Sequence, residues 1–135
     1  MVLLVCFLGV TSGAYAFRNE PAGFRELPWG TSVSGLEGME YLRESEEGGA
    51  MKIYVKRDEM LSMNGAKLES IEYGFVRGAL AQVTLKVKDL LNFVRLREAA
   101  FSIFGEGSEL LPGTERYYWD GDETRIELIS RLEFA

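Results

Sequence analysis

The chain has 135 residues, with 21 Asp or Glu, 15 Lys or Arg and a formal net charge of −6. It contains no histidine and a single cysteine. Zinc, copper and haem sites and His-dependent nucleophiles are therefore not expected, and we predict no cofactor, no metal site and no catalytic residue. The acidic balance, without clustered Lys and Arg to neutralise phosphates, argues against nucleic acid and against an anionic membrane surface.

Residues 1–16 have the pattern of a secretory leader. The apolar run Val2–Val10 is followed by Ala14-Tyr15-Ala16, an A-x-A cleavage site, although no Lys or Arg precedes the run. The run is shorter than the ~20 residues of a membrane helix, so no stable membrane span is expected once the leader is removed. We predict a signal peptide over 1–16, cleaved after Ala16, and one periplasmic or secreted domain over 17–135. The alternative is a buried N-terminal strand or helix.

Two strands are predicted after an irregular segment at 17–28 and a short helical turn that Thr31 could cap. They cover 39–43 and 50–56, and the second alternates apolar and polar residues with the period of a half-buried strand. Asn64-Gly65 predicts a hairpin, because both residues tolerate a positive φ.

A longer hairpin is predicted over 68–87, because apolar residues occupy odd positions on both sides of Arg77-Gly78. A two-residue loop would place apolar residues opposite polar ones. A three-residue loop, 76–78, instead pairs odd positions with odd positions, such as Tyr73 with Ala81. We therefore predict the three-residue loop.

One helix is predicted over 89–104, capped by Asp89 and ended by Gly105. A last hairpin is predicted around Asp120-Gly121, with Trp119 and Ile126 on one face. The apolar stripe of the helix comprises Leu90, Phe93, Val94, Ala100, Phe101 and Phe104.

The short, turn-like connections between these elements predict the fold class. We expect an α+β fold, in which an antiparallel sheet of about five to seven strands is built from hairpins and the 89–104 helix packs on one face.

Four sequence segments carry a family resemblance. They are Phe24-Arg25 with Trp29-Gly30-Thr31-Ser32, the stretch 70–75, Asn92-Phe93 with Phe104-Gly105, and Tyr117-Tyr118-Trp119 with Gly121. Together they resemble a group of small uncharacterised exported bacterial proteins, which implies export and an α+β domain but no activity. Such proteins tend to run further past the last hairpin. The early Trp-Gly-Thr-Ser turn is also similar to that of small outer-membrane assembly lipoproteins of the BamE type, although the lipid-bearing cysteine is missing.

Tyr54 and Tyr118 are the candidate binding residues. Each alternates with apolar residues on its strand, so both are expected on the sheet face that the helix leaves uncovered. There they could form an aromatic patch for a partner or ligand, or pack beside Lys and Arg stems on an ordinary exposed face.

The acidic clusters are explained more simply by turns than by a metal site or a catalytic site. Asp120-Gly-Asp-Glu123 could offer oxygens to calcium, but a hairpin turn explains the same residues. The acids at 44–47 are explained by a solvated turn.

We therefore predict a non-catalytic exported protein that binds an unknown envelope protein or small molecule. The alternative is a carboxylate-dependent hydrolase or lyase of the envelope, which needs two buried acids facing each other across a cleft. A third possibility is that the short C-terminus leaves an edge strand for a partner to extend.

Overall fold

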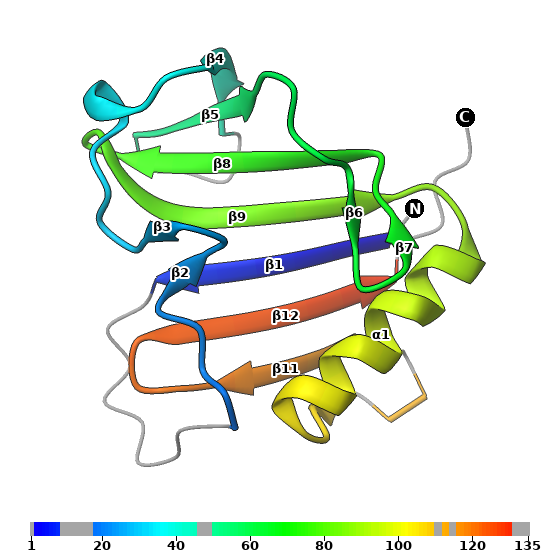
Figure 1. Ribbon diagram of the computed structural model, residues 1–135. Helices are drawn as coiled ribbons and strands as arrows, with labels where there is room; N and C mark the ends of the chain where they lie inside the picture. The colour runs from blue at the N-terminus through cyan, green and yellow to red at the C-terminus, as the bar shows by residue number, and fades with distance from the viewer. Residues whose placement is uncertain (1, 9–17, 46–49, 110–111, 114–115, 131–135) are drawn as a thin grey trace.

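The computed structural model describes residues 2–8, 18–45, 50–109, 112–113 and 116–130 (Figure 1). Eight strands belong to the main sheet: β1 (Val2–Leu8), β4 (Met39–Glu44), β5 (Met51–Lys56), β8 (Ser70–Val76), β9 (Ala79–Val87), β10 (Ser108–Glu109), β11 (Arg116–Asp120) and β12 (Thr124–Ser130). The remaining elements are β2 (Gly23–Phe24), β3 (Leu27–Pro28), the 3-10 helix η1 (Val33–Gly35), β6 (Ser62–Met63), β7 (Ala66–Lys67) and α1 (Leu90–Phe104).

The sheet is antiparallel throughout and has the strand order β10-β11-β12-β1-β9-β8-β5-β4. The helix α1 and the two-stranded ribbons β2–β3 and β6–β7 all lie on one side of it (Figure 1). We call this side the helix face and the other side the far face. Among the described residues, no helix has the length and apolar character that a membrane span requires.

The predicted fold class is wrong. Strands hold 48% of the structure and helix only 17%, so the fold is mostly β rather than α+β. The main sheet has eight strands, which exceeds the expected five to seven. The difference arises because several strands have only two residues, too few to show an alternating pattern, and because Val2–Leu8 forms a strand.

That N-terminal strand, β1, lies in the interior of the sheet. It pairs antiparallel with β12 on one side and with β9 on the other. The same residues form the apolar run of the predicted leader, and a strand within the fold is the alternative that the sequence left open for them.

The helix α1 forms as its end signals predict. Asp89 is the N-cap, and its side chain accepts a hydrogen bond from the Asn92 backbone N–H at 2.9 Å. Gly105, with φ of +91°, ends the helix. The predicted apolar stripe is only partly buried, because Leu90 in the first turn is 67% exposed while Phe93 is fully buried.

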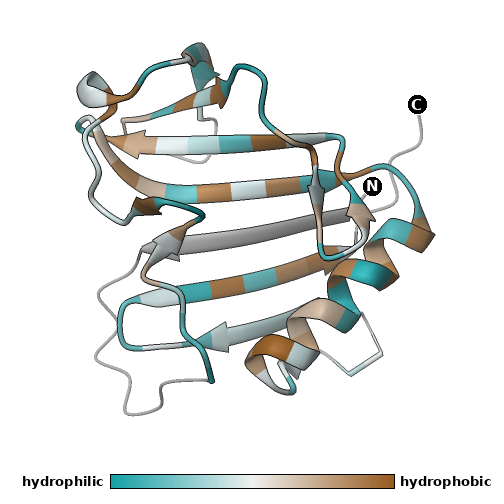
Figure 2. Ribbon diagram, in the orientation of Figure 1, coloured by the Kyte–Doolittle hydropathy of each residue, from teal (hydrophilic) through white to brown (hydrophobic). Residues whose placement is uncertain are grey.

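The core lies on the helix face of the sheet. Alternate residues of β8, β9 and β12 are apolar, which gives these strands the banded colouring of Figure 2. Their buried side chains pack beneath α1 and the ribbons in one continuous cluster. The largest fully buried members are Tyr73, Phe75, Phe93, Ile71, Leu80, Leu85 and Leu96.

The β8–β9 hairpin corrects the predicted loop. The loop has two residues, Arg77 and Gly78, with φ of +52° and +79°, and Val76 pairs with Ala79. A register shift after Gly74 then brings Tyr73 opposite Val83. The β-bulge supplies the extra residue that the prediction assigned to the loop, so odd positions share a face beyond the bulge, whereas next to the loop Phe75 pairs with Leu80.

The hairpin at Asn64-Gly65 forms as predicted, and the last hairpin keeps the predicted shared face but turns at 121–123, because Asp120 belongs to β11 and pairs with Arg125. Asn64 and Gly65 have φ of +48° and +84° and connect β6 to β7. Trp119 pairs with Ile126 across the β11–β12 hairpin. Both side chains belong to the core on the helix face.

Candidate functional site

The two predicted binding residues lie on opposite faces of the sheet. Tyr54 pairs with Tyr73, whose side chain is in the core on the helix face. Tyr118 alternates with the core residue Trp119 and pairs with Glu127, which places it on the far face. The expected shared patch is therefore not formed.

Each tyrosine has its own set of contacts. Tyr54 makes edge-to-face ring contacts with Tyr41 and Phe75, at centroid distances of 5.6 and 5.3 Å. The Arg125 guanidinium lies over the ring of Tyr118, 4.6 Å from its centroid. Both rings thus have neighbours within the chain, and a role in binding stays a prediction for each.

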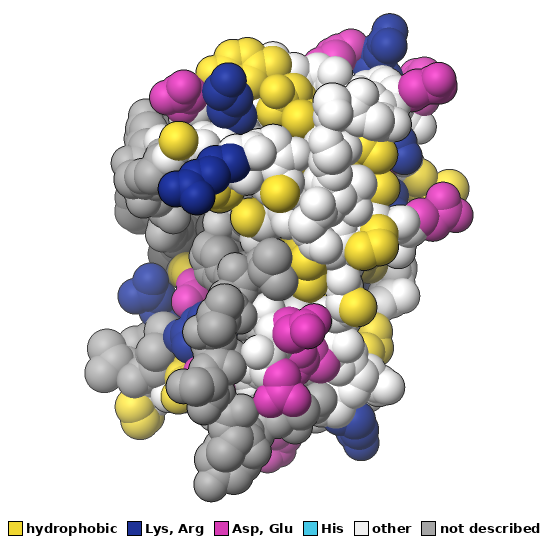
Figure 3. Space-filling view, turned by 90° about the vertical axis from the view of Figure 1, so that its left-hand side faces the viewer, with side chains coloured by type: hydrophobic (Ala, Val, Ile, Leu, Met, Phe, Trp, Pro, Cys, Tyr) yellow, Lys and Arg dark blue, Asp and Glu magenta, His cyan; other side chains and the backbone are white. Residues whose placement is uncertain are grey.

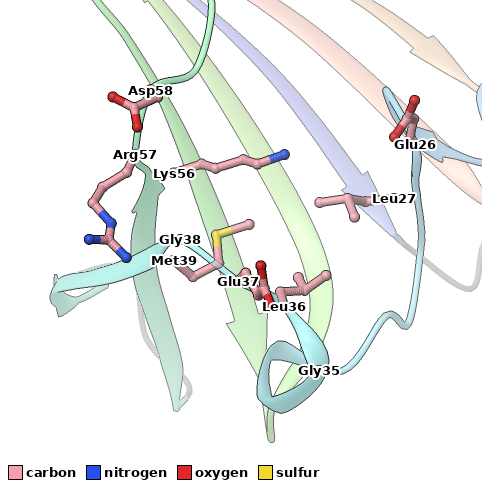
Figure 4. Close-up of a pocket in the computed structure, with 10 residues that line it drawn as sticks. All are labelled: Glu26, Leu27, Gly35, Leu36, Glu37, Gly38, Met39, Lys56, Arg57 and Asp58. Atoms are coloured by element: carbon pink, nitrogen blue, oxygen red, sulfur yellow. The ribbon is translucent and has the colours of Figure 1, made fainter.

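A hollow of about 700 Å³ opens on the helix face at the end of the sheet that α1 does not cover (Figure 4). It lies between the β2–β3 turn, η1, the start of β4 and the end of β5. Its lining combines an apolar base with charged groups: Leu27, Leu36 and Met39, then Lys56, Arg57, Glu26, Glu37 and Asp58, with Gly35 and Gly38 in the backbone.

Backbone hydrogen bonds hold the walls of this hollow. The Val33 N–H donates to the Gly78 carbonyl at 2.9 Å, which fixes η1 against the β8–β9 turn. The Arg57 N–H donates to the Gly38 carbonyl at 2.8 Å and joins the start of β4 to the end of β5. Thr31 does not cap η1, because its hydroxyl donates to the Pro28 carbonyl.

Lys56 is the distinctive charge of the site. Its side chain extends across the hollow toward Leu27 (Figure 4). No carboxylate of the described residues forms an ion pair with it, whereas the neighbouring Arg57 is 3.3 Å from Glu40. The hollow therefore contains an ammonium group without a carboxylate partner in the described part of the chain, and three carboxylates line the same hollow. A ligand bound there meets both a positive and a negative charge.

An ion pair between the exposed Arg25 and the buried carboxylate of Glu59 joins two segments of the same region. Arg25 Nη1 lies 3.1 Å from Glu59 Oε2, and the guanidinium also donates to the carbonyls of Met60 and Ser62 at 3.1 and 2.9 Å. The β2–β3 turn is thereby tied to the segment that follows β5. Since Glu26 and Asp58 are the sequence neighbours of these two groups, this ion pair holds two walls of the hollow together.

Glu59 also receives a hydrogen bond from the Tyr73 hydroxyl in the core. Burial, followed by the hydrogen bond and the negative charge of Glu59, raises the pKa of Tyr73 above its ordinary value, because an ionised phenol there would be desolvated and repelled. The second carboxylate oxygen, Oε1, is buried and has no hydrogen-bond partner among the described residues.

A second buried carboxylate, Glu72, lies on the far face. Arg43 Nη2 and Lys86 Nζ are 2.6 and 3.2 Å from its two oxygens. Burial acts to raise the pKa of Glu72, but the two cations outweigh it, and the pKa lies below its ordinary value. Glu59 and Glu72 thus lie on opposite faces and do not form the facing pair that the carboxylate-dependent alternative requires.

The acidic turn at 120–123 has a structural explanation. The Glu20 carboxylate accepts hydrogen bonds from the N–H groups of Asp122 and Glu123, at 2.6 and 2.8 Å. Acidic side chains gather on this side of the molecule (Figure 3). In the ranges that the structure describes, no group of three or more His, Cys, Asp or Glu is placed to hold a metal ion. The acids at 46–47 lie outside the described residues.

Sequence reasoning missed Lys56 and Glu59. The alternation of β5 indicates that Lys56 shares a face with Tyr54, but nothing in the sequence says that the segment 26–38 folds over that end of the strand. Glu59 looks like an ordinary loop acid, and only the tertiary structure brings Arg25 and Tyr73 to it.

Comparison with known proteins gives no relative from which a role could be transferred, and the resemblance to small exported bacterial proteins stays a prediction. No protein-family model, no curated protein and no solved structure matches this chain.

Proposed function

We propose that this protein is exported through its 1–16 leader and acts in the periplasm or outside the cell by binding rather than by catalysis. The leader pattern and the absence of histidine support this proposal. The separation of Glu59 and Glu72 also supports it, because these two buried acids of the described residues do not face each other as a carboxylate-dependent reaction requires.

The ligand that best fits the hollow is a small zwitterion with an apolar side chain, such as an amino acid or a short peptide. The single observation that carries this assignment is Lys56, an ammonium with no carboxylate partner among the described residues, in a hollow that three carboxylates also line. A purely anionic ligand would be repelled by those carboxylates, and a purely cationic ligand would be repelled by Lys56.

Each part of the ligand has a counterpart in the lining. Lys56 binds the ligand carboxylate, and Glu37 binds its ammonium group. Leu36 and Met39 contact the apolar side chain, which gains from leaving water. The hollow is within the usual size range of small-molecule sites, about 300–1,000 Å³.

Three related compounds test the charge requirement. Leucine carries both charges, N-acetylleucine only the negative one and leucinamide only the positive one. In calorimetric titrations of the exported protein we expect leucine to bind about fivefold more tightly than either blocked compound, since one ion pair is worth about 1 kcal/mol. Equal affinity for all three compounds would contradict the proposal.

The variant Lys56→Met tests the residue. We expect it to weaken leucine binding about fivefold, because the ligand carboxylate loses its counter-charge. Lys52→Met is the matched control, since Lys52 is an exposed lysine on the same face of β5 but does not line the hollow. An equal loss of affinity in both variants would point to overall charge rather than to this site.

A further inference from the structure

The predicted leader and the interior strand of the sheet are the same residues. In the full chain, β1 separates β9, β8, β5 and β4 on one side from β12, β11 and β10 on the other (Figure 1). Cleavage after Ala16 removes this strand. The exported form is then left with two facing strands, β9 and β12, that have each lost a row of backbone hydrogen bonds.

We propose that in the exported protein the gap between β9 and β12 is an acceptor site for an extended segment of another protein chain. The segment would add as a strand to both neighbours at once, in the place of β1. This inference rests on the proposed export and cleavage. It concerns a second surface, distinct from the hollow beside Lys56.

The gap does not close simply by bringing β9 and β12 together. Both strands run antiparallel to β1, so they are parallel to each other, two strand spacings or about 10 Å apart. At one end Trp29 Nε1 donates to Thr124 Oγ1 of β12 at 2.8 Å, while the next residue, Gly30, donates its N–H to the Leu80 carbonyl of β9 at 2.9 Å. The segment 29–30 therefore holds the two strands at their spacing.

The helix α1 holds the other side of the gap. It follows β9 directly, and Phe101 packs edge-to-face on Trp119 of β11 at a centroid distance of 5.7 Å. Since α1 contacts β1 in the full chain, loss of β1 leaves unfilled space beneath the helix. A partner strand would fill this space and satisfy the exposed backbone groups.

The walls of the gap define the chemistry of the occupant. On the helix face, it would contact the buried apolar residues Val83 and Leu85 of β9 and Ile126 and Leu128 of β12. Toward the far face, the walls carry polar groups. The facing pairs across the gap are Leu85 with Leu128, Thr84 with Glu127, Val83 with Ile126 and Gln82 with Arg125.

The occupant is accordingly a segment of about seven residues, antiparallel to both strands, with apolar residues at alternate positions and polar residues tolerated between them. A second copy of this chain is a poorer occupant. Each of the strands described in the main sheet is already paired, so none is free to insert. The partner is therefore a different protein with an unpaired strand of this pattern.

The test begins with the exported form, purified from an export-competent bacterial host that expresses the full chain. Its intact mass shows whether residues 1–16 have been removed, and light scattering gives its oligomeric state. The probe is a synthetic peptide with the sequence Val2–Leu8 and added terminal lysines for solubility. The control peptide carries Leu4→Asp and Cys6→Asp, at the positions opposite Leu85 and Val83.

We expect a cleaved monomer in which the amides of β9 and β12 that border the gap exchange with solvent far faster than those between β8 and β9. One equivalent of bound peptide should slow their exchange at least about tenfold, and the control peptide should not. The hollow near Lys56 should keep its affinity for leucine in both states, which separates the two sites.

Three results would overturn the inference, and each is distinguishable. Retention of residues 1–16 means that β1 fills its own place, and the proposed cleavage fails as well. A cleaved monomer whose β9 and β12 amides are already protected means that the gap has closed, while export stands. A protected dimer means that a second copy fills the gap, and the assignment to a different protein is wrong.

Discussion

A carboxylate is buried on each side of β8, Glu72 on the far face and Glu59 on the helix face, and the two negative charges are neutralised in different ways. On the far face, Glu72 has a cation on each of its oxygens, supplied by β4 and β9 of the same sheet. On the helix face, Glu59 has one cation, one phenol and an oxygen without a partner among the described residues. The first arrangement is set by strand register, whereas the second ties two loops to the core.

Because of this difference, the loss of one cation should destabilise the protein more at Glu59 than at Glu72. A buried charge that loses its only counter-charge is costly, but one that keeps a second counter-charge is not. The loops tied by Arg25 and Glu59 also form walls of the proposed ligand site, so their stability bears on function. Three predictions examine this contrast.

The largest effect is expected from Arg25→Ala. It should lower the free energy of unfolding by about 2–3 kcal/mol, because the buried Glu59 carboxylate loses its cation, although the Arg25 side chain is itself 31% exposed. Arg43→Ala should cost only about 1 kcal/mol, because Lys86 remains 3.2 Å from Glu72. Equilibrium unfolding in urea measures both values.

An exposed ion pair provides the baseline for this comparison. Arg57→Ala removes the contact with Glu40, in which both side chains are more than half exposed, and should change stability by less than about 1 kcal/mol. If Arg43→Ala lowered the free energy of unfolding as much as Arg25→Ala does, the proposed difference between the two faces would be wrong.

Tyr73→Phe should have an intermediate effect. It removes the hydroxyl that donates to Glu59, which should cost about 1–2 kcal/mol. Because the pKa of Tyr73 is raised in the folded state, the native protein keeps this proton where the unfolded chain loses it. The wild-type protein should therefore lose stability as the pH rises above about 10, the ordinary pKa of tyrosine, and the variant should lose less.

Urea unfolding at several alkaline pH values measures this dependence. Tyr54→Phe is the matched control on the neighbouring strand, since Tyr54 makes ring contacts with Tyr41 and Phe75 that phenylalanine can keep. An unchanged alkaline slope in Tyr73→Phe would show that the phenol and Glu59 are not coupled.

The smallest effect is expected from Glu72→Gln. The pKa of Glu72 is lowered in the folded state, so its stabilising contribution is present above the unfolded value of about 4.5 and is lost as the pH falls below it. The variant should be about 1 kcal/mol less stable at pH 7 and should lose less stability between pH 5 and pH 3. Thermal unfolding across this range tests both points, with the exposed Glu40→Gln as control.

Local chemistry made several elements predictable. The helix α1 begins at the residue after Asp89 and ends before Gly105, because an acidic cap and a left-handed glycine act within one turn of the chain. The hairpin at Asn64-Gly65 follows from the same kind of short-range preference, while the β11–β12 turn lies at 121–123, just after the predicted position. The alternation on β8 and β9 correctly indicated that odd positions share a face beyond the β-bulge, as in the pair Tyr73 and Val83.

The register of the β8–β9 hairpin could not be predicted. A two-residue loop with a β-bulge and a three-residue loop both place Tyr73 opposite an odd-numbered residue of β9. A two-residue loop without a bulge would have placed apolar positions opposite polar ones, and Arg77 adopts a positive φ that its residue type does not favour, so the three-residue loop was expected. The face of Tyr54 was also misjudged, whereas Tyr118 lies on the far face as expected, since alternation within one strand says which residues share a face but not which face is covered.

By itself, the sequence determined the short-range features of this protein: the capped helix, the tight turns, the alternating strands and a composition without histidine. The tertiary structure alone decided that Glu59 meets Arg25 and Tyr73, that Lys56 lies in a hollow, and that Val2–Leu8 lies between β9 and β12. The physical reason is distance along the chain. Caps and turns depend on neighbours a few residues away, whereas these contacts join segments that only the packing of the whole sheet brings together.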